Sequence, residues 1–140
     1  MTDNKKLILD VDTGSVIVEI RDKGEPIGEF KFNPNDSDII KRFEFVSEVL
    51  EKLQIPEDSK EESIFIVSDE IKRQFDYLFN YNVSGEIFCK CNPLTLTASG
   101  DFYCEEVLEK IANIIEKVTE QRIKKKKAKI QKATAKYSGR

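Results

Sequence analysis

Three stretches of the sequence place apolar residues at steps of three and four, the spacing that lines one face of an α-helix. These residues are Ile39, Phe43, Val46, Leu50 and Leu53, then Ile64, Val67, Ile71, Phe75 and Leu78, then Cys104, Leu108, Ile111, Ile115 and Val118. A helix with such a face must bury it against another layer. The spacing therefore predicts three amphipathic helices, over about 39–53, over about 63–80, and from about 102 onward.

Residues that cap or stop helices flank these stretches. The run 33–37 (NPNDS) offers Asn, Asp and Ser side chains that accept the first free backbone N–H groups of a helix, and Pro56 stops that helix. Ser99-Gly100-Asp101 precedes the third stretch in the same way. Its apolar face stops at Val118, so we expect the last helix to continue as a charged rod or to fold on a partner.

The first 32 residues have the composition of strands. Residues 7–12 (LILDVD), 15–20 (SVIVEI) and 27–32 (IGEFKF) are rich in β-branched or alternating apolar residues, and Thr13-Gly14 and 23–26 (KGEP) are turn signals between them. Residues 86–90 could form a further short strand, and 94–98 are ambiguous. We therefore expect an α+β fold: an N-terminal three-stranded antiparallel meander, three amphipathic helices, and a basic tail that continues the last helix.

Charge divides the 140-residue chain into two parts. Residues 121–140 contain nine Lys or Arg and no Asp or Glu, whereas residues 1–120 contain 14 basic and 26 acidic side chains, a net charge of −12. We expect residues 1–120 to form a single α+β domain and residues 121–140 a basic extension, helical or disordered. Such an asymmetry is typical of an interaction arm, or of a tail that docks on an acidic surface.

The composition argues against catalysis and metal binding. The chain has no histidine, the commonest metal ligand and the usual general base near neutral pH. Cys89, Cys91 and Cys104 could supply three thiolates to zinc, but a closed structural site needs four ligands. Asp10 and Asp12 resemble part of a metal-dependent phosphoryl-transfer site, although no phosphate-binding loop follows. We expect reduced thiols, no catalytic residues, no metal and no cofactor; an enzyme with an unrecognised site stays a weaker alternative.

No run of the sequence approaches the roughly 18 apolar residues that span a bilayer. The first six residues lead straight into an alternating stretch and not into a signal-peptide core. We therefore expect the protein to stay in the cytoplasm.

Two groups of residues are candidates for binding a partner. The first is basic: Arg122, Lys124, Lys125, Lys126, Lys127, Lys129 and Lys132; the second is aromatic: Phe75, Tyr77 and Phe79. Lysines bind phosphates, but the acidic residues 1–120, which we call the body, repel a polyanion such as a nucleic acid. The charges therefore favour docking of the lysines on an acidic protein or on another copy of the chain. The lysines could equally be a solvated helix end, and the aromatic residues could simply close the core.

The chain resembles the small tail assembly chaperones of long-tailed bacteriophages. The likeness rests on residues 28–36 (GEFKFNPND) before an amphipathic helix, on 75–79 (FDYLF), on the helix from Phe102 to Ile111, and on a lysine-rich end that closes on Lys136-Tyr137. It covers about residues 15–137 and includes no catalytic signature. The resemblance does not require the cysteines or the long opening over residues 7–20.

The resemblance implies a host-cytoplasmic, non-enzymatic protein that coats the tape-measure protein while the tail tube is built, and that associates with itself. In that family a ribosomal frameshift commonly produces a second, longer product. An amphipathic helix of a client can lie in an apolar groove of its chaperone. The alternative function is a small nucleic-acid-binding regulator that uses the lysine-rich arm.

Overall fold

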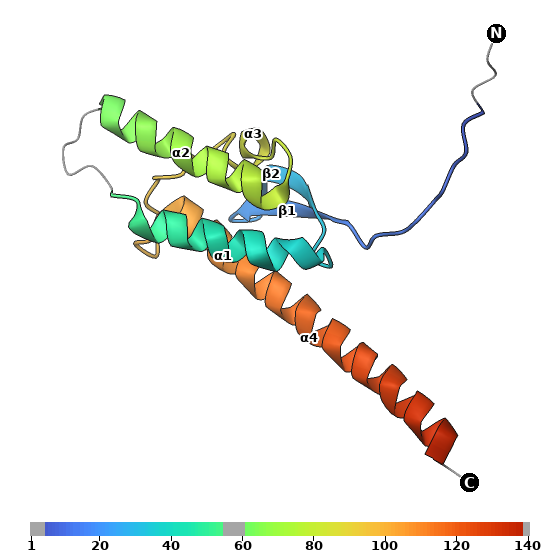
Figure 1. The fold of residues 1–140 in the computed structure, drawn as a ribbon. Helices are drawn as coiled ribbons and strands as arrows, with labels where there is room; N and C mark the ends of the chain where they lie inside the picture. The colour runs from blue at the N-terminus through green and yellow to red at the C-terminus, as the bar shows by residue number, and fades with distance from the viewer. Residues whose placement is uncertain (1–4, 55–60, 139–140) are drawn as a thin grey trace.

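The computed structural model describes residues 5–54 and 61–138, with the side chains of residues 122, 123 and 125–138 outside the description. The fold is α+β, as the sequence predicts (Figure 1). Its elements are β1 (Val16–Asp22), β2 (Glu25–Phe32), α1 (Ser37–Lys52), α2 (Glu61–Phe79), α3 (Ser84–Ile87) and α4 (Tyr103–Ser138). Among the described residues the sheet has two antiparallel strands, one fewer than expected, and four segments are helical.

Strands β1 and β2 form a tight hairpin. Lys23 and Gly24 join them with positive φ angles of 50° and 85°, the conformation of the two-residue turns that match the twist of paired strands. The register places Val18 opposite Phe30 and shifts between Ile20 and Arg21, where a bulge occurs. Phe30, at 3% exposure, shows that this face of the hairpin packs on the core.

The strand expected over residues 7–12 is not present, and this prediction was wrong. The segment is extended and projects away from the hairpin (Figure 1). Leu7 and Leu9 are 89% and 93% exposed. The chain leaves β1 at Gly14, whose φ of 82° and position against the Asn35 side chain direct the preceding residues away from the sheet. Residues 7–12 therefore have the pattern of a strand without a neighbour in this chain.

The short strand considered at residues 86–90 is also wrong, because Ser84–Ile87 form helix α3. The Asp76 carboxylate on α2 explains the helix. One of its oxygens accepts hydrogen bonds from the backbone N–H groups of Val83 and Ser84, and the other accepts from the Ser84 hydroxyl. In the ambiguous segment 94–98, Leu96 makes a single isolated bridge to Phe102.

Helices α1 and α2 lie close to their predicted ranges. Asp36 caps α1 by accepting a hydrogen bond from the Asp38 N–H, as the polar run before this helix predicts. Arg42 ties the start of α1 to the end of α2, since it donates to Asp36 at 2.8 Å and to the Leu78 carbonyl at 2.9 Å. The predicted stop at Pro56 lies outside the described residues.

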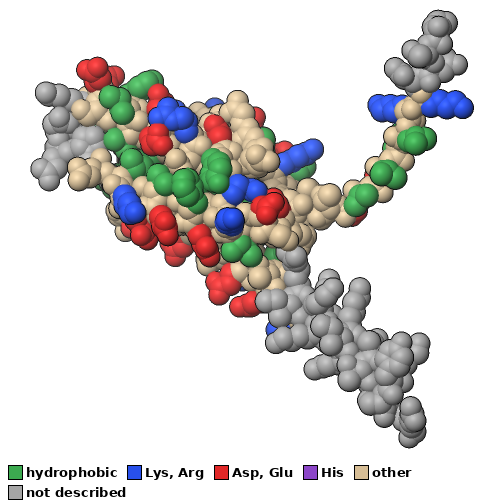
Figure 2. All heavy atoms as spheres, viewed as in Figure 1, with side chains coloured by type: hydrophobic (Ala, Val, Ile, Leu, Met, Phe, Trp, Pro, Cys, Tyr) green, Lys and Arg blue, Asp and Glu red, His purple; other side chains and the backbone are tan. Residues whose placement is uncertain are grey.

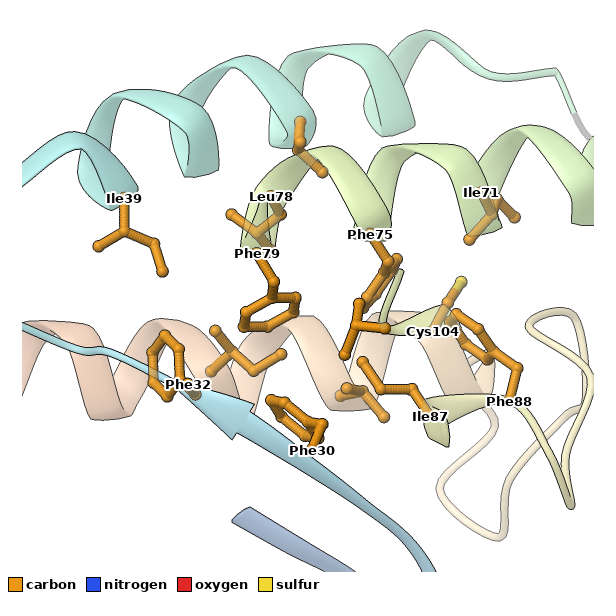
Figure 3. Packing of buried hydrophobic residues seen from close by; sticks show 14 of the residues in the cluster. Phe30, Phe32, Ile39, Ile71, Phe75, Leu78, Phe79, Ile87, Phe88 and Cys104 are labelled. Atoms are coloured by element: carbon orange, nitrogen blue, oxygen red, sulfur yellow. The ribbon is translucent and has the colours of Figure 1, made fainter. Parts of the chain in front are cut away.

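The hydrophobic core fills the space between the hairpin and the helices α1, α2, α3 and α4 (Figure 3). Phe79 of α2 stacks edge-on against Phe30 and Phe32 of β2, with ring centroids 5.0 and 5.4 Å apart. Phe75 lies one turn earlier and is fully buried against Phe88. The apolar spacing of the sequence thus identified the buried faces of the helices correctly.

Helix α4 begins at Tyr103, one residue after its predicted start, and continues to Ser138, well beyond the body (Figure 1). Its first turn is capped differently from the prediction. Glu105 accepts a hydrogen bond from the Phe102 N–H, the reciprocal half of a capping box, whereas Ser99 and Asp101 were expected to act as caps. The boundary expected at residue 120 falls inside this helix and stays a prediction.

Candidate protein-binding surfaces

The three aromatic residues proposed to bind a partner have separate locations. Phe75 and Phe79 are 0% and 8% exposed and lie in the core, where a partner cannot contact them. Tyr77 points outward from α2 and is 49% exposed, with its ring edge-on to Phe45 of α1 at 5.4 Å. The interpretation that Phe75 and Phe79 close the core is therefore correct, and of the three residues Tyr77 alone lies at the surface.

The basic candidates lie on the projecting part of α4. Lys124 is exposed. The side chains of Arg122, Lys125, Lys126, Lys127, Lys129 and Lys132 are outside the described residues, although the helix passes through all six positions. Their role in binding stays a prediction.

A groove that the sequence analysis did not identify opens between α1, α2 and the start of α4. It has a volume of about 480 Å³. We call it the acidic-rimmed groove, and its lining consists of Phe43, Ser47, Leu50, Glu51, Leu53, Val67, Ile71, Leu94, Phe102, Cys104, Glu105, Leu108 and Glu109. Most of these side chains are apolar, and the charged ones are all glutamates. The groove therefore offers an apolar floor to a helix and negative charge to its flanks.

Cys104 lies in the floor of the acidic-rimmed groove and is uncharged near neutral pH. Cys104 is 5% exposed, and burial raises the pKa of its thiol to about 11. The thiol is thus protonated near neutral pH and behaves as a small apolar side chain. At the rim, Glu51 and Glu109 are exposed, while Glu105 is engaged in capping α4.

A second groove of about 660 Å³ lies on a different side of α4, next to β1. We call it the strand-edge groove. Val18 and Ile20 of β1 form one wall, and Val107, Ile111 and Ile114 of α4 form its floor. The loop of residues 95–99 forms the far wall. There, the hydroxyls of Ser99 and Thr97 donate hydrogen bonds to Glu106 and lower the pKa of its carboxyl.

Further apolar side chains are exposed on the outer face of α1 and α2. Figure 2 shows hydrophobic side chains gathered over these two helices. Phe45 and Tyr77 are the paired rings of this face, and Phe65 and Ile66 are 64% and 63% exposed near the start of α2. An apolar patch of this kind is typical of a surface that contacts another protein.

The cysteines do not form a cluster that suggests chemistry. Cys89 is exposed, and its thiol lies 3.1 Å from the Ile27 carbonyl oxygen, to which it can donate a hydrogen bond. Cys104 is buried on α4. Within residues 5–54 and 61–138, no group of three His, Cys, Asp or Glu side chains is placed to hold a metal ion. Asp10 and Asp12 lie in the exposed segment that precedes β1.

Sequence reasoning missed both grooves because each is assembled from elements distant in the chain. One signal for the acidic-rimmed groove was present: Glu105 and Glu109 are four residues apart and flank Leu108, so they border the apolar stripe on one side of the helix. The contribution of Glu51 from α1 could not be read from spacing.

No protein-family model, no curated protein and no solved structure matches this chain. In the part of the chain that the structure describes, no helix is both long enough and apolar enough to cross a membrane.

Proposed function

We propose that this chain is an assembly chaperone that binds amphipathic helices of a client protein in its acidic-rimmed groove. It acts by binding and not by catalysis. The observation that carries the proposal is the groove itself, an open apolar channel among three helices whose charged lining residues are glutamates alone. A helix with an apolar stripe flanked by lysine or arginine complements that channel in shape and charge.

The client that fits the sequence resemblance is the tape-measure protein of a long-tailed phage. Before the tail tube encloses it, a long helical protein exposes apolar faces that would otherwise aggregate. The groove would cover one such face, and the exposed rings of Phe45 and Tyr77 offer a second apolar contact on the outer side of α1 and α2. This assignment places the protein in the cytoplasm of the host cell.

Charge also supports self-association. The body carries a net charge of −12 and residues 121–140 carry nine basic side chains, so the extension of one copy is attracted to the body of the next. A row of copies joined in this way would form a coat along a client. Such contacts are weakened by salt, because exposed charges are screened over about 8 Å at physiological ionic strength.

A charge-reversal pair tests the groove. The double variant Glu51→Lys/Glu109→Lys reverses two exposed rim residues that belong to α1 and α4. Its matched control, Glu48→Lys/Glu116→Lys, changes the same two helices by the same charge at exposed positions that do not line the groove. Binding of labelled helical fragments of the tape-measure protein encoded in the same genome is measured by fluorescence anisotropy.

The rim variant is expected to bind about tenfold or more weakly than the control, the effect of losing favourable charge pairs at an interface. Equal weakening in both variants would mean that only the overall charge matters, and the groove assignment would then fail. Binding of DNA or RNA that falls steeply with salt, without binding of the helical fragments, would favour the nucleic-acid alternative.

A further inference from the structure

The free edge of β1 has an orientation that follows from its partner strand. The Lys31 backbone N–H donates to the Tyr81 hydroxyl at 2.7 Å, and the Lys31 carbonyl accepts from the same hydroxyl at 2.8 Å. Both backbone groups of Lys31 therefore point away from β1. In an antiparallel pair, opposite residues share this orientation, so the N–H and C=O of Ile17, which faces Lys31, point to the outer edge of β1.

Glu19 lies two residues further along β1 and presents its backbone groups in the same direction. Among the described residues, no strand pairs with this edge. The outer edge of β2 is different, because the Tyr81 hydroxyl already occupies it at Lys31. The hairpin is thus closed to a further strand on one side and open on the other.

The strand-edge groove lies beside the open edge. The side chains of Val18 and Ile20 are only partly buried, and the apolar residues Val107, Ile111 and Ile114 of α4 form the floor beyond them. A strand added to β1 would place alternate side chains over this floor. The charged residues that line the groove are three acidic and three basic, so its net charge does not select a charged ligand. The groove requires a strand with one apolar face.

Residues 7–12, which we call the N-terminal arm, form such a strand. Leu7, Leu9 and Val11 alternate with Ile8, Asp10 and Asp12, so one face is wholly apolar and the other mostly acidic. The three residues of the apolar face are 89%, 93% and 73% exposed. Six extended residues span roughly 20 Å, close to the length of the seven-residue strand β1.

We propose that the N-terminal arm of one copy of this chain adds as a third strand to the β1 edge of a second copy, with Leu7, Leu9 and Val11 in that copy's strand-edge groove. The arm leaves its own body at Gly14, where the backbone has a φ of 82° and packs against the Asn35 side chain, and it projects away from its own sheet (Figure 1). Reciprocal exchange of two arms gives a closed dimer.

This contact is separate from the proposed function. The two grooves share no lining residue, and the arm contributes apolar contacts where the C-terminal extension contributes charge. Dimerisation through the arm is therefore expected to persist at high salt, whereas docking of the basic extension is expected to weaken.

A pair of arm variants tests the exchange by sedimentation velocity of the full-length chain at low and high salt. Leu9→Asp places a charge on the apolar face of the arm, and its matched control Ile8→Asp places the same charge on the opposite face. Both residues are exposed, at 93% and 80%, so neither change disturbs the body. Leu9→Asp is expected to raise the dissociation constant of the dimer by roughly thirtyfold or more, the effect of losing a central apolar contact. Ile8→Asp is expected to leave that constant nearly unchanged.

A complementation experiment then identifies the edge. Glu19→Pro removes an N–H from the open edge of β1, a position where proline is tolerated in an edge strand. This variant keeps its arm, and Leu9→Asp keeps its edge. Each change is expected to disable both contacts of its own homodimer, so at a concentration where the wild type is dimeric each variant alone is mostly monomeric. A mixture of the two is expected to form heterodimers through the one intact contact.

Three results would overturn the proposal: a wild-type chain that is monomeric at all concentrations, a Leu9→Asp dimer as stable as the wild type, or a dimer that dissociates with salt and requires residues 121–140. Each of these leaves the assignment of the acidic-rimmed groove untouched. If Glu19→Pro does not fold, as judged by circular dichroism, the comparison of Leu9→Asp with Ile8→Asp still decides.

Discussion

The Tyr81 hydroxyl closes the outer edge of β2 by making two hydrogen bonds to one residue, Lys31, which is 50 positions earlier in the chain. It accepts from the Lys31 N–H and donates to the Lys31 carbonyl, as a neighbouring strand would. Tyr81 follows the end of α2, so this pair also anchors the helix end to the hairpin. The contact explains why the sheet has one edge available and not two.

Removal of the Tyr81 hydroxyl is expected to destabilise the fold modestly. In Tyr81→Phe both hydrogen bonds to Lys31 are lost, but Lys31 is exposed and water can replace the partner, so we expect a loss of about 1 kcal/mol in the free energy of unfolding. Tyr77→Phe is the control, because it removes a hydroxyl from an exposed ring of α2 only four residues earlier in the chain. Urea denaturation measures both; equal stability of the two variants would contradict the role of Tyr81.

Two glycine variants test the close approach of β2 and α3. A Cβ atom on Gly28 would lie 2.6 Å from the backbone oxygen of Glu86, so Gly28→Ala must displace α3 and is expected to cost about 1–3 kcal/mol. A Cβ atom on Gly85, inside α3, meets nothing within 4 Å. Gly85→Ala is therefore expected to be neutral or to stabilise by up to about 1 kcal/mol. Thermal unfolding compares the pair, and a Gly28→Ala variant as stable as Gly85→Ala would show that the two elements do not approach so closely.

Alkaline pH is expected to destabilise the protein. Burial raises the pKa of Cys104 from about 9 to about 11 and that of Tyr103 from about 10 to about 12. Both groups then lose their protons more readily in the unfolded chain than in the folded one. The stabilisation is complete below pH 9 and declines as the pH rises from about 9 to about 12.

The upper part of this decline belongs to Tyr103, whose hydroxyl donates to the Ile87 carbonyl at 2.9 Å. Tyr103→Phe is expected to be less stable at neutral pH, because that carbonyl loses its partner, but to lose less stability between pH 10 and 12. Urea denaturation over this range measures both effects. A wild-type stability that stays constant to pH 12 would contradict the burial of these two groups.

Acid is expected to weaken the junction of α1 and α2. The hydrogen bonds from the Arg42 side chain and from the Asp38 N–H lower the pKa of Asp36. The contribution of its carboxylate to the free energy of unfolding is therefore complete above the ordinary carboxyl pKa and is lost as the pH falls through the lowered pKa. Asp36→Ala removes both the cap and the ion pair and is expected to cost about 1 kcal/mol at pH 7.

Asp36→Asn keeps a capping oxygen and loses only the ion pair, so at pH 7 it is expected to cost a few tenths of a kcal/mol, the usual effect for a partly exposed pair. The stability difference between wild type and Asp36→Asn is expected to shrink as the pH falls below about 4. A difference that is constant from pH 7 to pH 3 would mean that the Arg42 contact does not depend on the carboxylate charge.

The helices could be predicted well because the spacing of their apolar residues depends directly on which face of each helix is buried. Ile39, Val46 and Ile71 lie on the predicted faces and are buried. The strand predicted over residues 7–12 is absent for a physical reason: alternation indicates the capacity to form a strand, whereas pairing depends on the direction that the chain takes at Gly14. The short strand considered at residues 86–90 was a wrong prediction, because the Asp76 carboxylate accepts the hydrogen bonds that start α3.

The candidate sites were less predictable. The core position of Phe75 and Phe79 and the surface position of Tyr77 follow from which residues of α2 face β2 and Phe88. The sequence alone left both interpretations open. The acidic-rimmed groove needs Glu51 of α1 beside Glu109 of α4, a pairing set by tertiary packing. Only the charge asymmetry between the body and residues 121–140 follows directly from the sequence.

The most direct test of the proposed function is an amide hydrogen-exchange footprint of the full-length chain with and without a helical tape-measure fragment. If the helical fragment binds in the acidic-rimmed groove, new protection is expected in residues 43–53, which include the end of α1 and its C-cap, and in the first two turns of α4. Protection confined to β1, or to α4 beyond residue 120, with residues 43–53 unchanged, would contradict the proposed function.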